Sequence, residues 1–107
     1  MDKVFEALSS TIRRKILAYL SASSMTAGEI ADRFDVAKPT ISKHLSVLEG
    51  AGLVRSERHG QFIHYSLVEA NLVNTLTGFI QEVCPVTRPL RRESKKHAKM
   101  RKATGAG

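Results

Sequence analysis

The stretch from Thr26 to Leu67 constrains the fold most, because it carries start and stop signals for two helices and then a hairpin without interruption. Thr26 and Glu29 have the spacing of a capping box, in which a hydroxyl and a carboxylate satisfy backbone N–H groups at a helix start. This helix has an apolar face made of Ala27, Ile30, Ala31 and Phe34. After a turn at residues 35–37, Pro39 suits the first position of a second helix, where its missing N–H is not needed. The order predicts a helix-turn-helix.

The second helix, expected over residues 39–50, has two different faces. Its apolar residues recur at helical spacing and should be buried, namely Ile41, Leu45 and Leu48. Thr40, Lys43 and Val47 fall on another face. The residues near the N-terminus of such a helix would lie closest to base edges if it entered a DNA major groove.

Two β-rich runs between Leu53 and Leu67 predict a hairpin. We expect its two-residue connection at His59-Gly60, where glycine can supply a positive φ. A hairpin closing there pairs Arg58 with Gln61, Arg55 with His64, and Val54 with Tyr65. Following a helix-turn-helix, this hairpin forms a wing. The predicted fold class is therefore mainly α with a small β-hairpin (α+β): a winged helix-turn-helix with about five helices and a two-stranded wing.

Three further helices complete this prediction. Residues 2–9 form a short amphipathic helix, and a second helix starts at Ser10 or Thr11. The second helix should bury Ile12, Ile16, Leu17 and Leu20, and turn outward Arg13, Arg14 and Lys15. The last helix runs from Glu69 to about Cys84, and Pro85 stops it. Its apolar coverage exceeds what one small core can absorb, so a partner surface is expected.

Charge divides the chain into two parts. Residues 1–87 hold nine basic and nine acidic side chains, so the whole formal net charge of +7 lies in the remainder. We expect a DNA-binding and dimerisation domain over 1–87 and a basic, flexible tail over 88–107. The tail is either a nonspecific DNA arm or a solubilising end. With no signal peptide, no membrane span and one cysteine, the chain is expected in the cytoplasm, on the bacterial nucleoid.

Candidate DNA-binding residues lie on the second helix of the helix-turn-helix and on the wing. Those at the helix are Lys38, Thr40, Ser42, Lys43 and His44. Lysine can reach a guanine edge or a phosphate, and the hydroxyls offer short contacts. Those on the wing are Arg55, Arg58, His59 and Gln61, groups that track phosphates or enter a narrow minor groove. An ordinary solvated hairpin is the alternative for the wing.

Four strings in this chain resemble the bacterial ArsR/SmtB-type winged-helix repressors, over about residues 3–84: ALSSTIRRKIL, MTAGEIADRF, KPTISKHLSVLEGAGLV and RHGQFIHYSL. The chain is most similar to the small non-metal autorepressor (SdpR-like) subgroup. The resemblance implies a homodimer joined through its first and last helices, bound to a near-palindromic operator in double-stranded DNA. The apolar faces of these two helices agree with that, and the expected dimer-interface residues are Val4, Phe5, Leu8, Leu72, Val73, Leu76, Phe79, Ile80 and Val83.

The chain departs from metal-sensing relatives at the positions that would hold a metal. Where they carry Cys-x-Cys, it has Ala31 and Arg33, and the last helix offers only Glu69 and Glu82. Its histidines are not expected to cluster, so no metal and no cofactor are expected. Cys84 is either a small, partly buried apolar residue or a thiol sensor acting through its symmetry mate.

Taken together, the sequence predicts a homodimeric, autoregulatory DNA-binding repressor with no catalytic activity. Ser42 and His44 are neighbours on one helix, but no third orienting group accompanies them. Three alternatives stay open: a winged helix that binds a protein partner, a redox-responsive repressor using Cys84, and a nonspecific binder of nucleic acid or membrane surfaces driven by the tail. The sequence names no small-molecule inducer.

Overall fold

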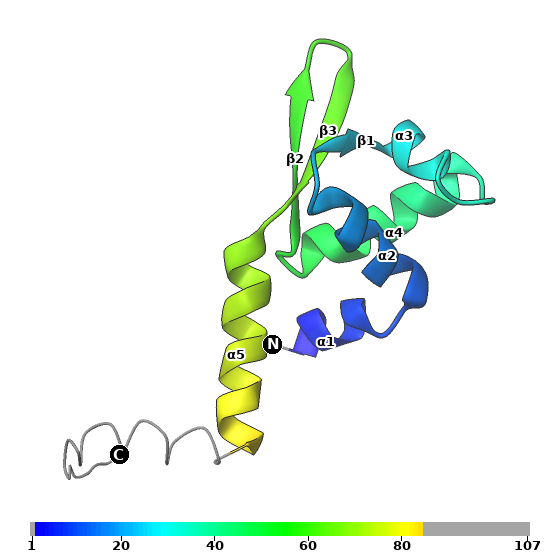
Figure 1. Cartoon of the computed structure of the whole chain (residues 1–107). Coiled ribbons are helices and arrows are strands. Elements are labelled where there is room, and N and C mark those ends of the chain that lie inside the picture. The colour runs from blue at the N-terminus through cyan, green and yellow to red at the C-terminus, as the bar shows by residue number, and fades with distance from the viewer. Residues whose placement is uncertain (1, 85–107) are drawn as a thin grey trace, which may run out of the picture. The chain divides into compact units, whose positions relative to one another are not determined.

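The structure, a computed structural model, describes residues 2–84 of the chain. Its elements follow the order drawn in Figure 1: α1 (Asp2–Leu8), α2 (Thr11–Leu20), β1 (Met25–Thr26), α3 (Ala27–Ala31), α4 (Lys38–Gly50), β2 (Val54–His59), β3 (Phe62–Leu67) and α5 (Glu69–Val83). The predicted α+β winged helix-turn-helix with five helices is confirmed. Of the described residues, 2–73 belong to one compact unit and 74–84 to another.

Two sequence expectations concern residues that the structure does not describe. The stop at Pro85 and the basic tail at 88–107 both lie outside the described residues. Within residues 2–84, no helix combines the length and the apolar character that a membrane crossing requires.

The helices begin where the sequence places their capping residues. Ser10 caps α2, and its hydroxyl accepts the backbone N–H three residues on. The capping box of α3 is complete: Thr26 Oγ1 accepts from the Glu29 N–H at 3.1 Å, and Glu29 Oε1 accepts from the Thr26 N–H at 2.9 Å. That backbone hydrogen bond holds the pKa of the Glu29 carboxyl below its ordinary value. α4 begins at Lys38, one residue before the expected start, so Pro39 occupies its first turn.

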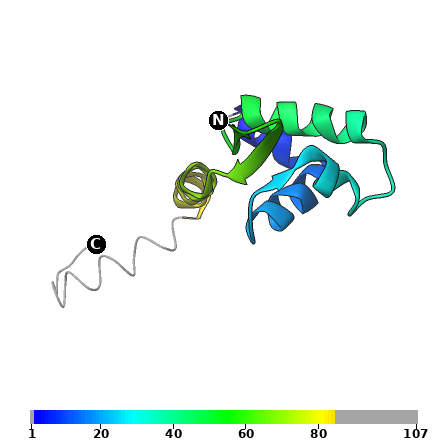
Figure 2. The same ribbon diagram turned by 90° about the horizontal axis from the view of Figure 1, so that it is seen from above.

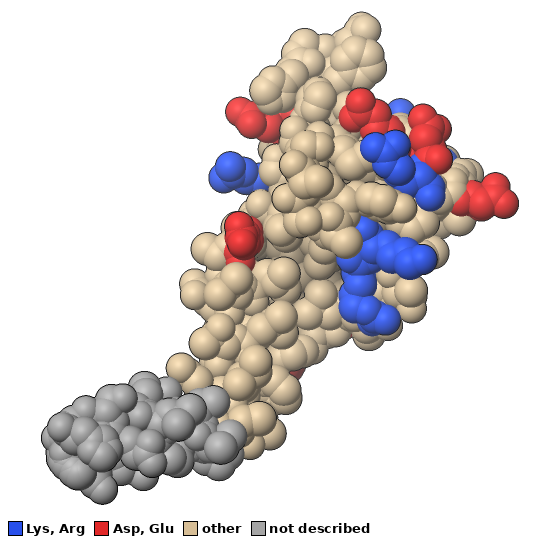
Figure 3. All heavy atoms as spheres, in the orientation of Figure 1, with Lys and Arg blue, Asp and Glu red and all other residues tan. Residues whose placement is uncertain are grey.

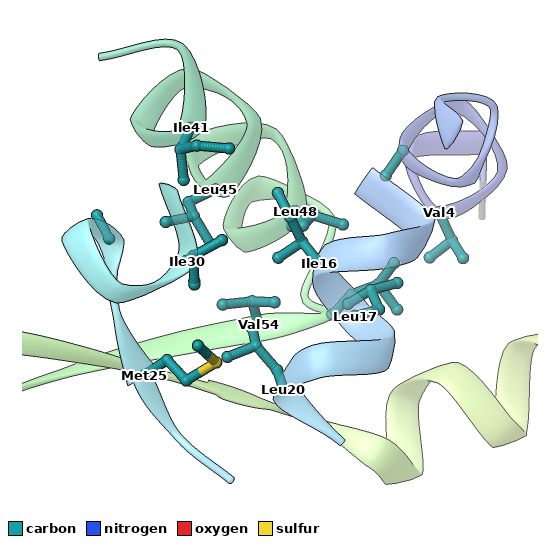
Figure 4. Packing of buried hydrophobic residues seen from close by; sticks show 13 residues of the cluster. Val4, Ile16, Leu17, Leu20, Met25, Ile30, Ile41, Leu45, Leu48 and Val54 are labelled. Carbon is teal, nitrogen blue, oxygen red and sulfur yellow. The ribbon is translucent and has the colours of Figure 1, made fainter. Parts of the chain in front are cut away.

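The hydrophobic core forms around the predicted inner face of α4. Ile41, Leu45 and Leu48 are fully buried, and Figure 4 shows them in one cluster with Ile16 of α2 and Ile30 of α3. Seen from above in Figure 2, α2 and α3 lie along the same side of α4. Burial of this stripe sets the rotation of α4 about its axis and leaves its opposite face to solvent.

The sheet has a third strand that the sequence analysis did not predict. β1 pairs antiparallel with β3, with Met25 opposite Tyr65 and Thr26 opposite His64, so the order is β1-β3-β2. Two residues are too few to show the alternation that marks a strand. Their pairing instead depends on β3, which is forty residues away along the chain. β1 joins the base of the wing to the start of α3.

The predicted register of the wing is wrong by two positions. Arg58 lies opposite Ile63, Arg55 opposite Ser66, and Val54 opposite Leu67, so His64 faces Glu57 rather than Arg55. The two-residue turn is Gly60-Gln61 and not His59-Gly60, because His59 still pairs with Phe62. Gly60 has a φ of 65°, whereas closure one residue earlier would bring His59 into a turn position that favours positive φ. A shift by two keeps every side chain on its expected face.

Candidate nucleic-acid interface

The N-terminal half of α4 presents the polar face that the sequence predicts. Lys38, Thr40 and Lys43 are exposed, and Ser42 is half-buried. The residue before the helix, Ala37, provides no side-chain cap. Pro39 has no N–H, and the Thr40 N–H donates to Ala37 O at 3.0 Å, so the exposed Lys38, Thr40 and Lys43 side chains are the main polar groups of this helix end.

His44, the fifth predicted DNA contact on α4, is half-buried and contacts Arg13. The Arg13 guanidinium donates from Nε to Ala7 O at 2.8 Å and from Nη2 to Glu6 O at 3.1 Å, both at the end of α1. Its Nη1 lies 3.2 Å from His44 Nδ1. Because arginine has no acceptor, His44 Nδ1 must accept, which places the imidazole proton on Nε2. Burial, and then the Arg13 charge, lower the pKa of the His44 imidazole.

This contact corrects the prediction that Arg13 points outward. Arg13 is half-buried and links the C-terminal end of α1 to α4. Helical periodicity could not reveal the link, because its two side chains are 31 residues apart. A direct contact between His44 and DNA stays a prediction, and its half-burial leaves less of the ring for one than Lys43 has available.

The four wing candidates are all exposed, and two of them have neighbours in the chain. Arg58 Nη1 donates to Gly60 O at 3.4 Å, which holds the guanidinium near the turn. His59 Nε2 lies 3.5 Å from Glu57 Oε1, and its ring meets that of His64 at a centroid distance of 5.0 Å. The expectation that no histidines cluster is therefore wrong, because the corrected register brings His59 and His64 together.

The structure also reveals apolar side chains on the wing that the sequence analysis did not select. Phe62 is 56% exposed and Ile63 is 41% exposed. Both line a cleft of about 330 Å³ that also includes Lys38 and Ser42 of α4 and Gln61 at the tip of the wing. A phenylalanine directly after a hairpin turn was the available signal. The cleft joins the two sets of predicted DNA contacts.

The predicted dimer-interface residues differ in how much surface they leave. α5 has no buried residue, and large apolar side chains of it are exposed: Val73, Phe79, Ile80 and Val83. Leu72 packs partly against the core and Leu76 is half-buried. Val4 is only 6% exposed, since α1 turns it into the core of its own chain, and Phe5 and Leu8 are half-buried. Most of the surface available to a partner therefore belongs to α5.

The described residues carry similar numbers of basic and acidic side chains, so the positions of the basic groups matter more than their number. On the face drawn in Figure 3, Lys and Arg side chains are interspersed with Asp and Glu side chains. The polar face of α4 is an exception in the sequence, because residues 38–48 contain two lysines and no acidic residue. Directed contacts, rather than a general positive field, are expected from such a surface.

The chain is similar in sequence to known transcriptional regulators. A family model described as a helix-turn-helix domain matches residues 8–57. The transcriptional repressor SdpR of Bacillus subtilis (strain 168) is 45% identical over 85 residues, which cover 77% of this chain and 94% of that protein. The chain belongs to the ArsR/SmtB-type family of winged-helix repressors.

A second relative and a solved structure agree with this family. The uncharacterized HTH-type transcriptional regulator YuzN of Bacillus subtilis (strain 168) is 38% identical over 87 residues, covering 75% of this chain and 95% of that protein. The ArsR-like transcriptional regulator from Rhodococcus sp. RHA1 matches with a TM-score of 0.74 and 32% identity, covering 80% of this chain and 79% of that one. Since these relatives are transcriptional regulators, the prediction that the chain is not an enzyme is confirmed.

Ala31 and Arg33 occupy the two positions at which the sequence analysis expected metal-sensing relatives to carry cysteine. Ala31 ends α3 and Arg33 follows it, and the Arg33 guanidinium lies over the Tyr19 ring at 5.8 Å. Residues 2–84 contain no group of three or more His, Cys, Asp or Glu side chains placed to hold a metal ion. The thiol of Cys84 is exposed in the described single chain, and its two predicted roles, a small apolar residue near the interface or a thiol sensor, stay predictions.

Proposed function

We propose that this ArsR/SmtB-type protein is a homodimeric, autoregulatory repressor that acts in the bacterial cytoplasm, on the nucleoid. It would bind a near-palindromic operator with α4 in the major groove and the wing at the flanking groove. Two α4 helices would enter successive major grooves, about 34 to 36 Å apart. The observation that carries the proposal is the cleft in which Lys38 and Ser42 of α4 meet Gln61 of the wing, since it joins the two groove-reading elements.

The dimer part of the proposal is supported by α5. A helix of 15 residues with no buried residue and several large apolar side chains exposed is unfavourable in water. A second copy of the chain would cover this face symmetrically and add the core that a domain of this size needs. One solved relative, from Mycobacterium bovis, is a homodimeric winged helix-turn-helix DNA-binding domain, and its 24% identity extends the likeness in fold alone.

The proposal is tested by binding of the purified chain to DNA from its own upstream region, measured by fluorescence anisotropy at physiological salt. We expect tighter binding than to a scrambled duplex of equal length, with two protomers per site. Lys43→Ala should weaken operator binding by about tenfold or more, because it removes one groove contact. Lys15→Ala, which removes an exposed lysine from α2, is the matched control and should have little effect.

Two results would overturn the proposal. One is equal affinity for operator and scrambled duplexes, and the other is a protein that stays monomeric at micromolar concentration. The exposed face of α5 would then favour the second candidate function, a winged helix that docks on a different protein. That candidate predicts that the wild-type chain does not bind the operator and that substitutions on the exposed face of α5 abolish binding to the partner protein.

A further inference from the structure

The wing carries exposed apolar side chains that the fold itself does not explain. Phe62, at 56%, is the most exposed of the large hydrophobic side chains in residues 2–84. Neither Phe62 nor Ile63 belongs to the hydrophobic core or to the partly buried residues packed against it. Both directly follow the Gly60-Gln61 turn, where a polar residue would serve a solvated hairpin equally well. Exposed apolar side chains of this kind are typical of a binding surface.

The surroundings of the pair combine apolar, hydroxyl and cationic groups. The cleft that Phe62 and Ile63 line is also lined by Lys38 and Ser42, and no acidic residue lines it. Arg58 of the wing is the cross-strand partner of Ile63 and adds a cation to that of Lys38 on α4. A DNA strand presents the complementary sequence of groups, because anionic phosphates alternate with deoxyriboses whose faces are largely apolar.

We propose that Phe62, the more exposed of the two, holds a DNA strand by apolar contact with a deoxyribose, while Lys38 and Ser42 hold the adjoining phosphate. The inference rests on the proposed function. It adds a contribution to DNA affinity that does not depend on salt, which the polar contacts do not supply. Lysine and arginine contacts act through phosphate charge and release counterions, so they depend on salt. Apolar contact with sugar depends on area removed from water and not on ionic strength.

This difference gives the first experiment. Affinities of the full chain for operator and nonspecific duplexes are measured across a range of salt concentrations. Phe62→Ser should weaken binding to both duplexes by about tenfold, because DNA would no longer cover the roughly half of the phenylalanine side chain that is exposed in the free protein. The slope of affinity against salt concentration should not change. Lys38→Gln is the comparison, and it should reduce the slope by about 0.9. An affinity unchanged in Phe62→Ser, or a loss accompanied by a reduced slope, overturns the inference.

A second variant guards against an indirect effect of Phe62→Ser on folding. The chain contains no tryptophan, so Phe62→Trp places a single fluorescent reporter at the wing. Its indole should become protected from acrylamide quenching when duplex is added. Phe34→Trp, a half-buried position in contact with Tyr19, is the control and should show no change. Protection on anionic lipid vesicles but not on DNA would overturn the inference in favour of a membrane surface.

The outcomes separate the inference from the proposed function. If the wild-type chain binds all duplexes equally and Phe62→Ser still weakens that binding at constant salt slope, operator recognition fails and the apolar contact stands. If operator preference is clear and Phe62→Ser is neutral, the apolar contact fails and the repressor stands. If no duplex binds, both are overturned.

Discussion

Arg13 should be the most sensitive polar residue in the described structure, and Arg13→Met tests this. The substitution keeps an apolar stem of similar reach and removes the guanidinium. It would leave Ala7 O, Glu6 O and His44 Nδ1 without the donors that now lie at 2.8, 3.1 and 3.2 Å. The variant therefore separates the hydrogen bonds of Arg13 from the packing of its methylenes.

The expected loss follows from the number and environment of these contacts. A net hydrogen bond contributes about 1 kcal/mol, and one to a charged group contributes somewhat more when buried. Since Arg13 is half-buried, we take the lower figure for each contact, which predicts a loss of about 2 to 3 kcal/mol in the free energy of unfolding. For a domain of this size that corresponds to a decrease in Tm of about 10 to 20 °C.

Urea unfolding at a constant protomer concentration measures this loss, since dimerisation would make stability depend on concentration. Lys15→Met is the matched control, because it removes the same charge from the exposed side of α2. It should change stability by no more than about 0.5 kcal/mol. Equal stabilities of Arg13→Met and Lys15→Met would refute the assignment of Arg13 as the link between α1 and α4.

The same contact predicts a pH dependence with a definite sign. The pKa of His44 lies below 6.5 in the folded chain because of burial and, next, the Arg13 charge. The unfolded chain then binds the proton more readily than the folded chain. The contribution of neutral His44 to the free energy of unfolding is therefore fully present above a pH of about 6.5. It should fall as the pH drops below that value and level off below the folded pKa. The account would be contradicted by an NMR titration in which His44 has an ordinary pKa. It would also be contradicted if the pKa of His44 were the same in Arg13→Met as in the wild-type chain.

Three further predictions concern the turn, the apolar face and the thiol. Gly60→Ala should cost about 1 kcal/mol in urea unfolding, because φ is 65° there and a Cβ meets no neighbour, whereas Gly78→Ala in α5 should stabilise or be neutral; the reverse order would argue against the turn. Ile80→Asp should turn dimers into monomers in sedimentation velocity, by placing a charge in a dry interface, and a dimer of unchanged affinity would remove α5 from it. Cys84→Ser should abolish any response of operator affinity to oxidant if the thiol is a sensor, and a wild-type affinity that is equal in oxidant and reductant excludes that role.

Local signals predicted the helices and the candidate DNA-binding surface of α4. The capping box at Thr26 and Glu29, and the apolar stripe through Ile41, Leu45 and Leu48, depend on residues within a few turns of one another. Such patterns can be recognised without knowing the rest of the fold. They also predict correctly that Lys43 is exposed.

The errors concern contacts that helical or strand periodicity does not specify. The alternation of residues in the wing set the face of each side chain but left the register open by two positions, and the positive φ of Gly60 decided it. β1 exists only because β3 offers a free edge to Met25 and Thr26. A charged residue such as Arg13 is assigned to solvent by periodicity, since only the approach of α1 and α4 reveals its acceptors.

The amino-acid sequence by itself determined the order of the five helices and the two wing strands, the inner and outer faces of α4, and the family, because each depends on short-range spacing or on matched strings of residues. Tertiary structure decided which side chains meet: Arg13 with His44, His59 with His64, and the apolar Phe62 with the cleft beside Lys38. The physical reason is that packing brings together groups whose separation along the chain carries no signal. The residues that we propose to hold DNA through the wing belong to this second group.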